Sequence, residues 1–350
     1  MSLEDIRKQI DLVDGKLIQL LQQRMEQAIL SKRFKKQVED TGREQAILET
    51  IRENAQPLAD GDFLVALYQQ IFQQSKALQS KPLKTIAFQG EHGAYSEVAA
   101  KSWNPDFICL PCVEFADIFE GVRTGLYDYG IVPVENTLGG LVSQANDLMI
   151  RTQLNICGAI EIPINHCLVA CPGTDVHEIR DVFSHPQALA QCRGFLSKNN
   201  LKAVHYFDTA GAAKMLSEKN LTNSAAICSA LAAKIYRLDI MKESIEDYEI
   251  NRTRFLILSK EANKETGNKC SIVFSTAHKS GTLFNVLEKF AKARLNLTRI
   301  ESIPNEKGTY AFFLDFIGRR EDEKVKNVLA SLATATEQFR VLGFYEEMKL

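Results

Sequence analysis

The 350-residue sequence lacks several features that would place it in a class at once. No apolar run approaches the 18 residues of a membrane span, and the charged, helically periodic N-terminal stretch lacks the apolar core of a secretion signal. Neither sign of charge dominates, because 42 Lys and Arg stand against 44 Asp and Glu. This balance argues against a nucleic-acid-binding protein. We expect a cytoplasmic protein in which any anion site is a local cluster of cations.

The eight cysteines stand mostly in apolar stretches, such as "HCLVAC" and "AAICSA". This placement is typical of buried thiols in a reducing compartment. A zinc site built from Cys109, Cys112, Cys167 and Cys171 is the alternative. Histidines at ligand spacing do not accompany these pairs, which disfavours the metal site.

The pattern of the sequence changes twice, which indicates three domains over residues 1–80, 84–260 and 269–350. The first shows helical spacing of apolar residues and has no proline before Pro57. We expect one helix over about 3–38 and shorter helices over 43–54 and 62–79. The first would be roughly 54 Å long, which is too long for the other two to cover. An all-helical, intertwined dimer is therefore predicted.

The second and third segments have other patterns. Residues 84–260 alternate strands with helices, which indicates an α/β fold whose ligands are held by the loops at strand ends. A polar linker follows over 260–269. The remaining residues predict strands over 270–276, 295–303, 309–317 and 338–346 and helices over 281–293 and 321–335. This βαββαβ order is typical of an α+β, ferredoxin-like fold.

The helical segment carries a set of charged and polar side chains but no nucleophile. Arg24 and Lys35 are about three turns apart on an uninterrupted helix, so they point to nearly the same side. Arg7 lies about 25 Å from Arg24 and can share a small ligand only with Arg24 of the partner subunit in an antiparallel dimer. For any one charge alone, a solvated surface position is the alternative. The full set is Arg7, Arg24, Lys35, Asp40, Arg43, Glu44, Ser75 and Gln79.

This set, within "IRKQIDLVDGKL", "LLQQRMEQA", "DTGRE" and "SKALQ", resembles the all-helical chorismate mutase family, which rearranges chorismate to prephenate. Such a rearrangement needs a folded, well-held substrate and donors at the breaking ether oxygen. The resemblance assigns the substrate carboxylates to Arg24 and to Arg7 of the partner subunit, and the ether oxygen to Lys35 and Gln79. The remaining members would bind the ring hydroxyl, orient neighbouring cations or support a carboxylate: Asp40, Arg43, Glu44 and Ser75.

Four polar loops of the α/β segment resemble those of prephenate dehydratase: "GEHGAYSE", "PVENTLGG", "SHPQALAQC" and "NRTRF". The family has two α/β lobes with a cleft between them. The resemblance makes Thr253 the acid that protonates the departing hydroxyl, Arg254 a fork for a substrate carboxylate, and Phe255 a residue that keeps the cleft dry. His185 is the alternative acid, since its pKa is better suited. The remaining candidate substrate contacts are Ser96, Asn136, Thr137, Ser184 and Gln187.

The C-terminal segment resembles an ACT domain of the phenylalanine-sensing kind. "SGTLFNVLEKF" matches a glycine-led loop that opens a helix, and "ESIP" matches a Glu-Ser-Arg-Pro signature with Ile303 in place of arginine. A structural appendage is the alternative. The effector-binding residues that the resemblance implies are Ser280, Gly281, Thr282, Leu283, Glu301 and Ser302.

Together the three resemblances imply a bifunctional chorismate mutase–prephenate dehydratase of phenylalanine biosynthesis. It would need no cofactor or metal, would form a homodimer or higher oligomer, and would be inhibited by L-phenylalanine. Two alternatives stay open on the sequence: a dehydratase whose helical segment serves only dimerisation, and a non-catalytic ligand sensor.

Overall fold

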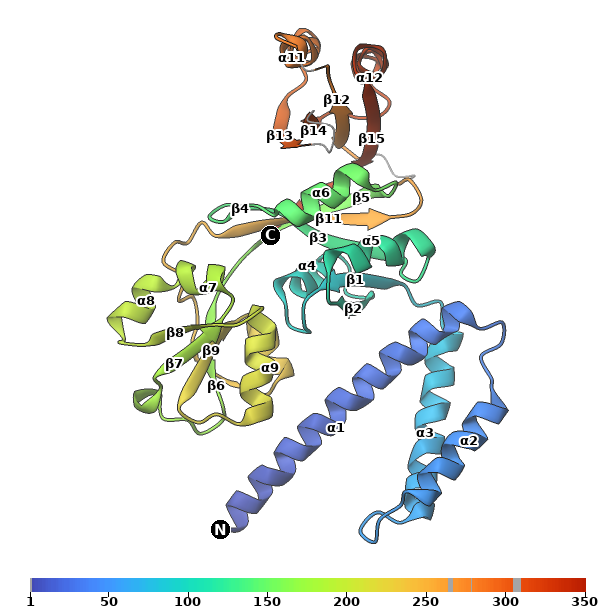
Figure 1. The fold of residues 1–350 in the computed structure, drawn as a ribbon, viewed down its shortest axis with the longest axis vertical. Coiled ribbons are helices and arrows are strands. Elements are labelled where there is room, and N and C mark those ends of the chain that lie inside the picture. The colour runs from blue at the N-terminus through green and yellow to red at the C-terminus, as the bar shows by residue number, and fades with distance from the viewer. Residues whose placement is uncertain (1, 264–266, 278, 305–309) are drawn as a thin grey trace. The chain divides into compact units, whose positions relative to one another are not determined.

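The computed structural model describes residues 2–263, 267–277, 279–304 and 310–350. The chain forms two compact units, Met1–Lys84 and Thr85–Leu350 (Figure 1). Within the described ranges, no helix is long and apolar enough to cross a membrane.

The first unit consists of three helices: α1 (Leu3–Ser31), α2 (Thr41–Glu53) and α3 (Gly61–Ser80). The expected helix over 3–38 is shorter than predicted. It ends at Ser31 and gives way to a 3-10 turn over Lys32–Phe34, after which Lys35 has an extended backbone. The other two helices start where aspartates cap them, because Asp40 accepts from the Arg43 amide and Asp60 from the Phe63 amide.

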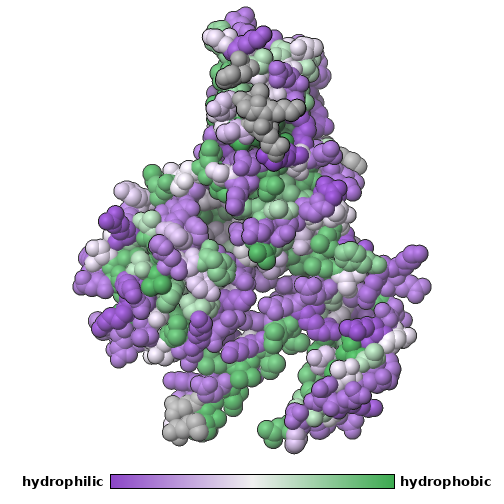
Figure 2. Space-filling model, viewed as in Figure 1, coloured by the Kyte–Doolittle hydropathy of each residue, from purple (hydrophilic) through white to green (hydrophobic). Residues whose placement is uncertain are grey.

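One side of α1 leaves large apolar side chains uncovered within its own unit. They form a continuous apolar strip in Figure 2. Helices normally bury such a stripe against a partner. The exposed residues are Leu3, Ile6, Ile10, Val13, Leu17, Ile18, Leu20 and Leu21.

The second unit begins with a mixed, seven-stranded sheet in the order β16-β5-β11-β3-β1-β2, with β4 paired to β3. Strands β1, β2 and β3 are parallel, whereas β11 is antiparallel to both β3 and β5. The strands are β1 (Thr85–Gln89), β2 (Ile108–Cys112), β3 (Tyr129–Asn136), β4 (Gly140–Leu141), β5 (Asn155–Pro163), β11 (Arg252–Ser259) and β16 (Glu347–Lys349). The helices of this lobe are α4 (Tyr95–Trp103), α5 (Phe115–Thr124) and α6 (Ser143–Arg151).

A second lobe is built on a five-stranded sheet in the order β10-β6-β9-β7-β8. Its strands are β6 (Cys167–Ala170), β7 (Asp181–Ser184), β8 (Lys202–His205), β9 (Ser224–Cys228) and β10 (Asp239–Lys242). Its helices are α7 (Pro186–Gln191), α8 (Arg193–Lys198), α9 (Thr209–Lys219) and α10 (Ala230–Ile235), with a 3-10 turn over Val176–Glu178. The two-lobed α/β fold is therefore confirmed.

The cysteines of the zinc alternative are divided between the two lobes. Cys109 and Cys112 lie on β2 of the first lobe, whereas Cys167 lies on β6 and Cys171 in the core of the second. All eight cysteines are free thiols, and seven of them are buried. The alternative is therefore wrong for this set of four.

The C-terminal segment forms a four-stranded antiparallel sheet in the order β13-β14-β12-β15, with helices α11 and α12 on one face (Figure 1). Its elements are β12 (Lys269–Ser275), α11 (Thr282–Lys292), β13 (Leu297–Pro304), β14 (Tyr310–Ile317), α12 (Glu323–Ala335) and β15 (Gln338–Tyr345). The ferredoxin-like prediction is confirmed. The expected linker over 260–269 includes residues 264–266, which lie outside the described residues.

Strand β16 is an element that the sequence pattern did not predict. It follows β15 directly and pairs in parallel with β5, so the end of the C-terminal segment becomes part of the first lobe's sheet. This pairing is one reason why residues 85–350 form a single compact unit.

Candidate active sites

A pocket of about 400 Å³ lies between the two lobes of the second unit. The loops that follow β1, β3, β7 and β8 reach its wall, as expected for a ligand site at the carboxyl ends of parallel strands. Five of the predicted residues line it: Ser96, Asn136, Gln187, Thr253 and Phe255. The structure thus brings residues from all four quoted loops to one place.

The hydroxyl of Thr253 is held by a single amide. Asn136 Nδ2 lies 2.9 Å from Thr253 Oγ1, 2.9 Å from Asn251 Oδ1 and 3.0 Å from Arg252 O, to which it donates. Asn136 Oδ1 accepts from the backbone amides of Leu138 (3.1 Å) and Gly139 (2.6 Å). The two backbone donors fix which end of the Asn136 amide carries the nitrogen. Because Thr253 Oγ1 accepts this bond, its own O–H is free to donate to a group in the pocket.

Arg254 points away from the pocket, since successive side chains of a strand face opposite sides of the sheet. Its Nη1 lies 2.7 Å from Asp315 Oδ2, its Nε 2.5 Å from Glu347 Oε1, and its Nη2 3.0 Å from the Tyr345 hydroxyl. Burial lowers the pKa of Arg254, but the Asp315 carboxylate outweighs this and raises it above its usual value. The expectation that Arg254 forks a substrate carboxylate is therefore wrong.

Two other predicted substrate contacts are used inside the fold. The buried Ser184 hydroxyl donates to the carbonyl of Ile227 at 2.7 Å, which ties β7 to β9. The Thr137 hydroxyl donates to Ile250 O at 2.6 Å and accepts from the Arg252 amide at 2.9 Å. Neither residue belongs to the lining of the pocket. The structure thus contradicts a direct substrate contact for both, although Thr137 holds the start of the strand that carries Thr253.

The start of α4 offers an anion site at the wall of the pocket. Gly93 has φ +90°, and a Cβ there would come within 2.5 Å of the Ala232 Cα, so only glycine fits. Residue 94 at the N-cap is an alanine and has no side-chain acceptor, so the first amides of the helix, beside Ser96, can receive a carboxylate.

Glu97 holds this loop in place. Its Oε2 accepts from the Gly93 amide at 2.7 Å and lies 3.2 Å from His92 Nδ1, while its Oε1 lies 2.6 Å from Lys101 Nζ. Burial raises the pKa of Glu97, but His92, Lys101 and the Gly93 amide together lower it to about 2. The carboxylate is therefore ionised throughout the physiological range.

Gln191 and His166 line the pocket but were not predicted from the sequence. Gln191 Nε2 donates to Asn136 Oδ1 at 3.3 Å, and its Oε1 lies 2.9 Å from His166 Nε2. Gln191 stands one helical turn after Gln187, so the i, i+4 spacing within "SHPQALAQC" would have indicated it. His166 has no such local signal, because it precedes an apolar strand and is itself buried.

Asp208 and His185 also line the pocket. Asp208 caps α9 through the Gly211 amide, and burial raises the pKa of its carboxyl group. Burial lowers the pKa of His185, and its Nδ1 accepts from the Gln187 amide at 3.2 Å. A lowered pKa and an existing hydrogen bond both make this imidazole a poorer proton donor at pH 7. They disfavour His185 as the acid.

The first unit brings together three of its predicted residues. Arg24 Nη1 donates to Ser75 Oγ at 2.8 Å, and its guanidinium lies over the Phe72 ring at 5.4 Å. Gln79 lies one turn beyond Ser75 on α3 and is 5% exposed. Its Oε1 has no hydrogen-bond partner among the described residues, which leaves a buried polar atom for a ligand or partner to satisfy.

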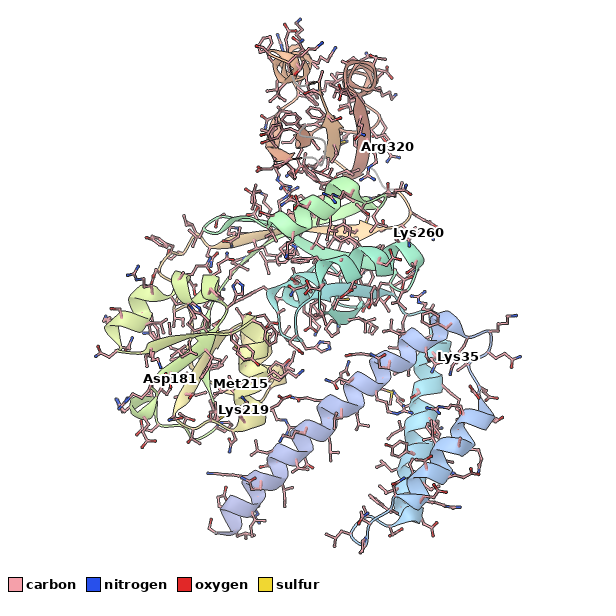
Figure 3. All side chains as sticks on the ribbon, viewed as in Figure 1. Lys35, Asp181, Met215, Lys219, Lys260 and Arg320 are labelled. Carbon is pink, nitrogen blue, oxygen red and sulfur yellow. The ribbon has the colours of Figure 1, made fainter. Side chains whose placement is uncertain are left out.

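The other predicted residues of this unit lie elsewhere. Lys35 is exposed and lies beyond the end of α1, so the expectation that it continues the face of Arg24 is wrong (Figure 3). Glu44 pairs with Lys76 at 3.2 Å. Asp40 caps α2. Arg7 is exposed near the start of α1, some 25 Å along the helix from Arg24.

The predicted effector residues flank two elements of the C-terminal segment. Gly281 caps α11 with φ +85°, and Thr282 Oγ1 lies 2.9 Å from Lys279 O in the same turn. On β13, Glu301 lies on the same face as Arg299, with its Oε1 4.0 Å from Arg299 Nε, and Arg299 Nη2 donates to Asn146 Oδ1 of the first lobe. Ser302 faces the opposite side. Ser280 and Leu283 lie in or beside the Gly281 turn.

Comparisons with known proteins identify the families of both units. A chorismate mutase type II model matches residues 6–80, and a prephenate dehydratase model matches residues 86–263. A bifunctional chorismate mutase/prephenate dehydratase of Pseudomonas aeruginosa is 34% identical over 365 residues, covering 100% of this chain and 99% of the relative. An arogenate dehydratase/prephenate dehydratase 2, chloroplastic, of Arabidopsis thaliana is 38% identical over 327 residues, covering 85% of this chain and 86% of the relative.

A solved structure supports the same assignment. The prephenate dehydratase of Arthrobacter aurescens in complex with L-Phe has a TM-score of 0.70 and 33% identity, covering 75% of this chain and 89% of that one. Two family models in series and a relative aligned along the whole sequence leave one conclusion: the chain belongs to the prephenate dehydratase family, in its bifunctional form with an N-terminal chorismate mutase type II domain.

Proposed function

We propose that the two reactions of this bifunctional chain take place at separate sites. Chorismate would rearrange to prephenate beside Arg24, Ser75 and Gln79, and prephenate would become phenylpyruvate in the pocket around Thr253. The bond from Asn136 to Thr253 carries the second assignment, because it turns the threonine into a hydrogen-bond donor toward the pocket.

In the dehydratase reaction the ring carboxylate leaves as CO₂, and its bonding electrons move into the ring as the C4 hydroxyl departs. Hydroxide is a poor leaving group, so a proton must reach it, and Thr253 Oγ1–H supplies that proton. Among the described lining residues of the pocket none is lysine or arginine. A cation on the departing carboxylate would stabilise the ground state and slow its loss, so this composition favours decarboxylation.

Because Arg254 does not line the pocket, the carboxylate of the pyruvyl side chain must bind other donors. The first backbone amides of α4 and the Ser96 hydroxyl supply donors at the pocket wall, and the side-chain amide of Gln187 supplies another. Phe255 contributes apolar surface that excludes water from the reacting ring.

The mutase site requires a second subunit. Arg24 binds one substrate carboxylate, and Gln79 donates to the ether oxygen through Nε2. Arg7 of the partner subunit supplies the second carboxylate contact in an antiparallel homodimer. The exposed apolar strip of α1 supports this dimer, since it gives the two long helices a surface to bury against each other. Lys35 would reach the substrate from the segment beyond α1.

L-phenylalanine would bind the C-terminal segment and inhibit the dehydratase. The solved relative in complex with L-Phe supports this choice of ligand. The Gly281 turn at the start of α11 presents amides to the carboxylate of the amino acid. Inhibition follows if phenylalanine binds one global conformation more tightly than another.

Arogenate is a second candidate substrate, and Asp208 is the observation that favours it. Arogenate carries an ammonium group where prephenate carries a keto group, and Asp208 is a carboxylate at a pocket that has no lysine or arginine among its described lining residues. The Arabidopsis thaliana relative is named for both substrates. Asp208→Asn keeps an N-cap acceptor for α9 but removes the charge. We expect it to lower kcat/KM for arogenate more than for prephenate; an unchanged ratio would leave prephenate as the substrate.

One coupled assay tests the main proposal. The full-length protein is supplied with chorismate, and both prephenate and phenylpyruvate are measured. Formation of both products, with Thr253→Ala accumulating prephenate, supports two separate sites. Loss of both activities in Thr253→Ala would contradict it.

A further inference from the structure

Strand β11 carries Thr253 toward the pocket and Arg254 toward the C-terminal segment. We infer that the C-terminal segment positions the catalytic threonine through the ion pair between Arg254 and Asp315. The inference rests on the proposed role of Thr253 and assigns Arg254 and Asp315 as positioning residues, since neither touches the pocket.

Among the described residues, every side-chain partner of Arg254 comes from the C-terminal segment or from β16, which continues it. Asp315 on β14 is 0% exposed and faces Nη1, while Glu347 and Tyr345 take Nε and Nη2. These partners are themselves fixed: Ser271 Oγ lies 2.5 Å from Asp315 Oδ1 and 2.6 Å from the Tyr345 hydroxyl. The guanidinium is thus held on all its edges by one rigid, buried network.

The backbone of β11 is irregular at the same point. The ladder between β11 and β3 shifts register between Arg254 and Phe255. Such bulges interrupt the ladder and re-aim neighbouring side chains. The main chain beside Thr253 therefore has less support from β3 than a regular strand has, and the Arg254 side chain supplies a second anchor. A movement of this anchor shifts Thr253 relative to Asn136 Nδ2.

The same strand provides a matched control. Arg252 lies two residues earlier on the same face, and its Nε is 2.6 Å from Glu161 Oε1. Glu161 belongs to β5 of the first lobe, so this ion pair joins β11 to β5, and the Oε2 of Glu161 also lies 3.2 Å from Lys349 Nζ of β16. Asp315→Asn and Glu161→Gln each remove one carboxylate charge from an arginine that flanks Thr253. Only the first removes a partner of Arg254.

The test uses both variants in the full-length protein, with kcat and KM of each reaction. We expect Asp315→Asn to lower the dehydratase kcat about 10- to 100-fold, as small misplacements of catalytic groups do, with a smaller change in KM. Glu161→Gln should change kcat less than about two-fold, and neither variant should alter the mutase. Equal losses from both variants, or no loss from Asp315→Asn, would overturn the inference.

A double variant separates positioning from general damage to the fold. With the hydroxyl removed by Thr253→Ala, nothing remains to be misplaced, so adding Asp315→Asn should cause little further loss of the residual dehydratase rate. Fully multiplicative losses would mean that Asp315 acts independently of Thr253. If Thr253→Ala alone keeps full activity, the proposed acid is wrong, which is a different result from failure of the anchor.

A milder variant covers the case in which Asp315→Asn does not fold. Arg254→Lys keeps the buried charge but cannot bind three partners in fixed directions. We expect a dehydratase kcat between those of wild type and Thr253→Ala, with KM nearly unchanged. A wild-type kcat in this variant would overturn the inference by itself.

Discussion

Asn136 and Thr253 meet at 2.9 Å across strands β3 and β11, with the amide as donor and the hydroxyl as acceptor. The direction of this bond decides whether the threonine can protonate a substrate.

Asn136→Asp replaces the donor nitrogen with an oxygen that can only accept. Thr253 O–H would then donate to the new carboxylate and turn away from the pocket. We expect the dehydratase kcat to fall at least as far as in Thr253→Ala, with the mutase unchanged. Asn155→Asp is the control, since Asn155 Nδ2 donates to the exposed Lys260 carbonyl far along the sheet. Equal mild effects of the two variants would contradict the proposed direction.

Thr253→Ala and His185→Ala distinguish the two candidate acids. Burial lowers the pKa of His185, which disfavours the charged imidazole as the proton donor. We expect Thr253→Ala to lose most of the dehydratase activity and His185→Ala to keep most of it. Steady-state rates with prephenate measure both, and the reverse order would make His185 the acid.

Arg7→Ala and Arg24→Ala should each be nearly inactive as mutase homodimers. If one site uses Arg24 of one subunit and Arg7 of the other, a mixed dimer of the two variants holds one intact site. Co-expression should therefore restore part of the chorismate mutase activity. The absence of any recovery in isolated mixed dimers would count against a shared site.

The lowered pKa of Glu97 predicts how stability depends on pH. Its pKa falls from 4.5 to about 2 on folding. The carboxylate therefore stabilises the fold by about 3 kcal/mol above pH 4.5, and this contribution is lost as the pH falls toward 2. Glu97→Gln should lower the free energy of unfolding at pH 7 and match the wild type more closely near pH 3. A difference independent of pH in denaturant titrations would show that packing, not charge, is responsible.

Gly281→Val tests the effector turn. Gly281 has φ +85°, so a β-branched residue there costs about 1–2 kcal/mol and distorts the turn. We expect inhibition by phenylalanine to weaken strongly while basal dehydratase activity persists. Gly173→Val is the matched control, because Gly173 has φ +79° in an open turn of the second lobe. Calorimetry of the full-length protein should show phenylalanine binding lost only in the Gly281 variant. Undiminished inhibition in that variant would place the effector elsewhere.

The sequence by itself determined the order and class of the elements. Helical spacing without proline, strand–helix alternation and the βαββαβ order depend on local periodicity, so they could be read directly. Short loops such as "PVENTLGG" and "NRTRF" also indicated the dehydratase site, because their polar residues follow strands at the edge where such sites form. The end of α1 was missed, since no proline or glycine marks the 3-10 turn after Ser31.

Only the tertiary structure decided what each polar side chain does. Arg254 stands beside Thr253 in sequence, yet the alternation of side chains along the strand places it against Asp315, 61 residues away. The Ser184 hydroxyl donates to the carbonyl of a neighbouring strand and does not reach the pocket. His166 and Gln191 entered the pocket through contacts between segments far apart in the chain. The periodicity of a sequence indicates which side of a helix or strand is buried. It does not indicate which residue from a distant part of the chain contacts that side.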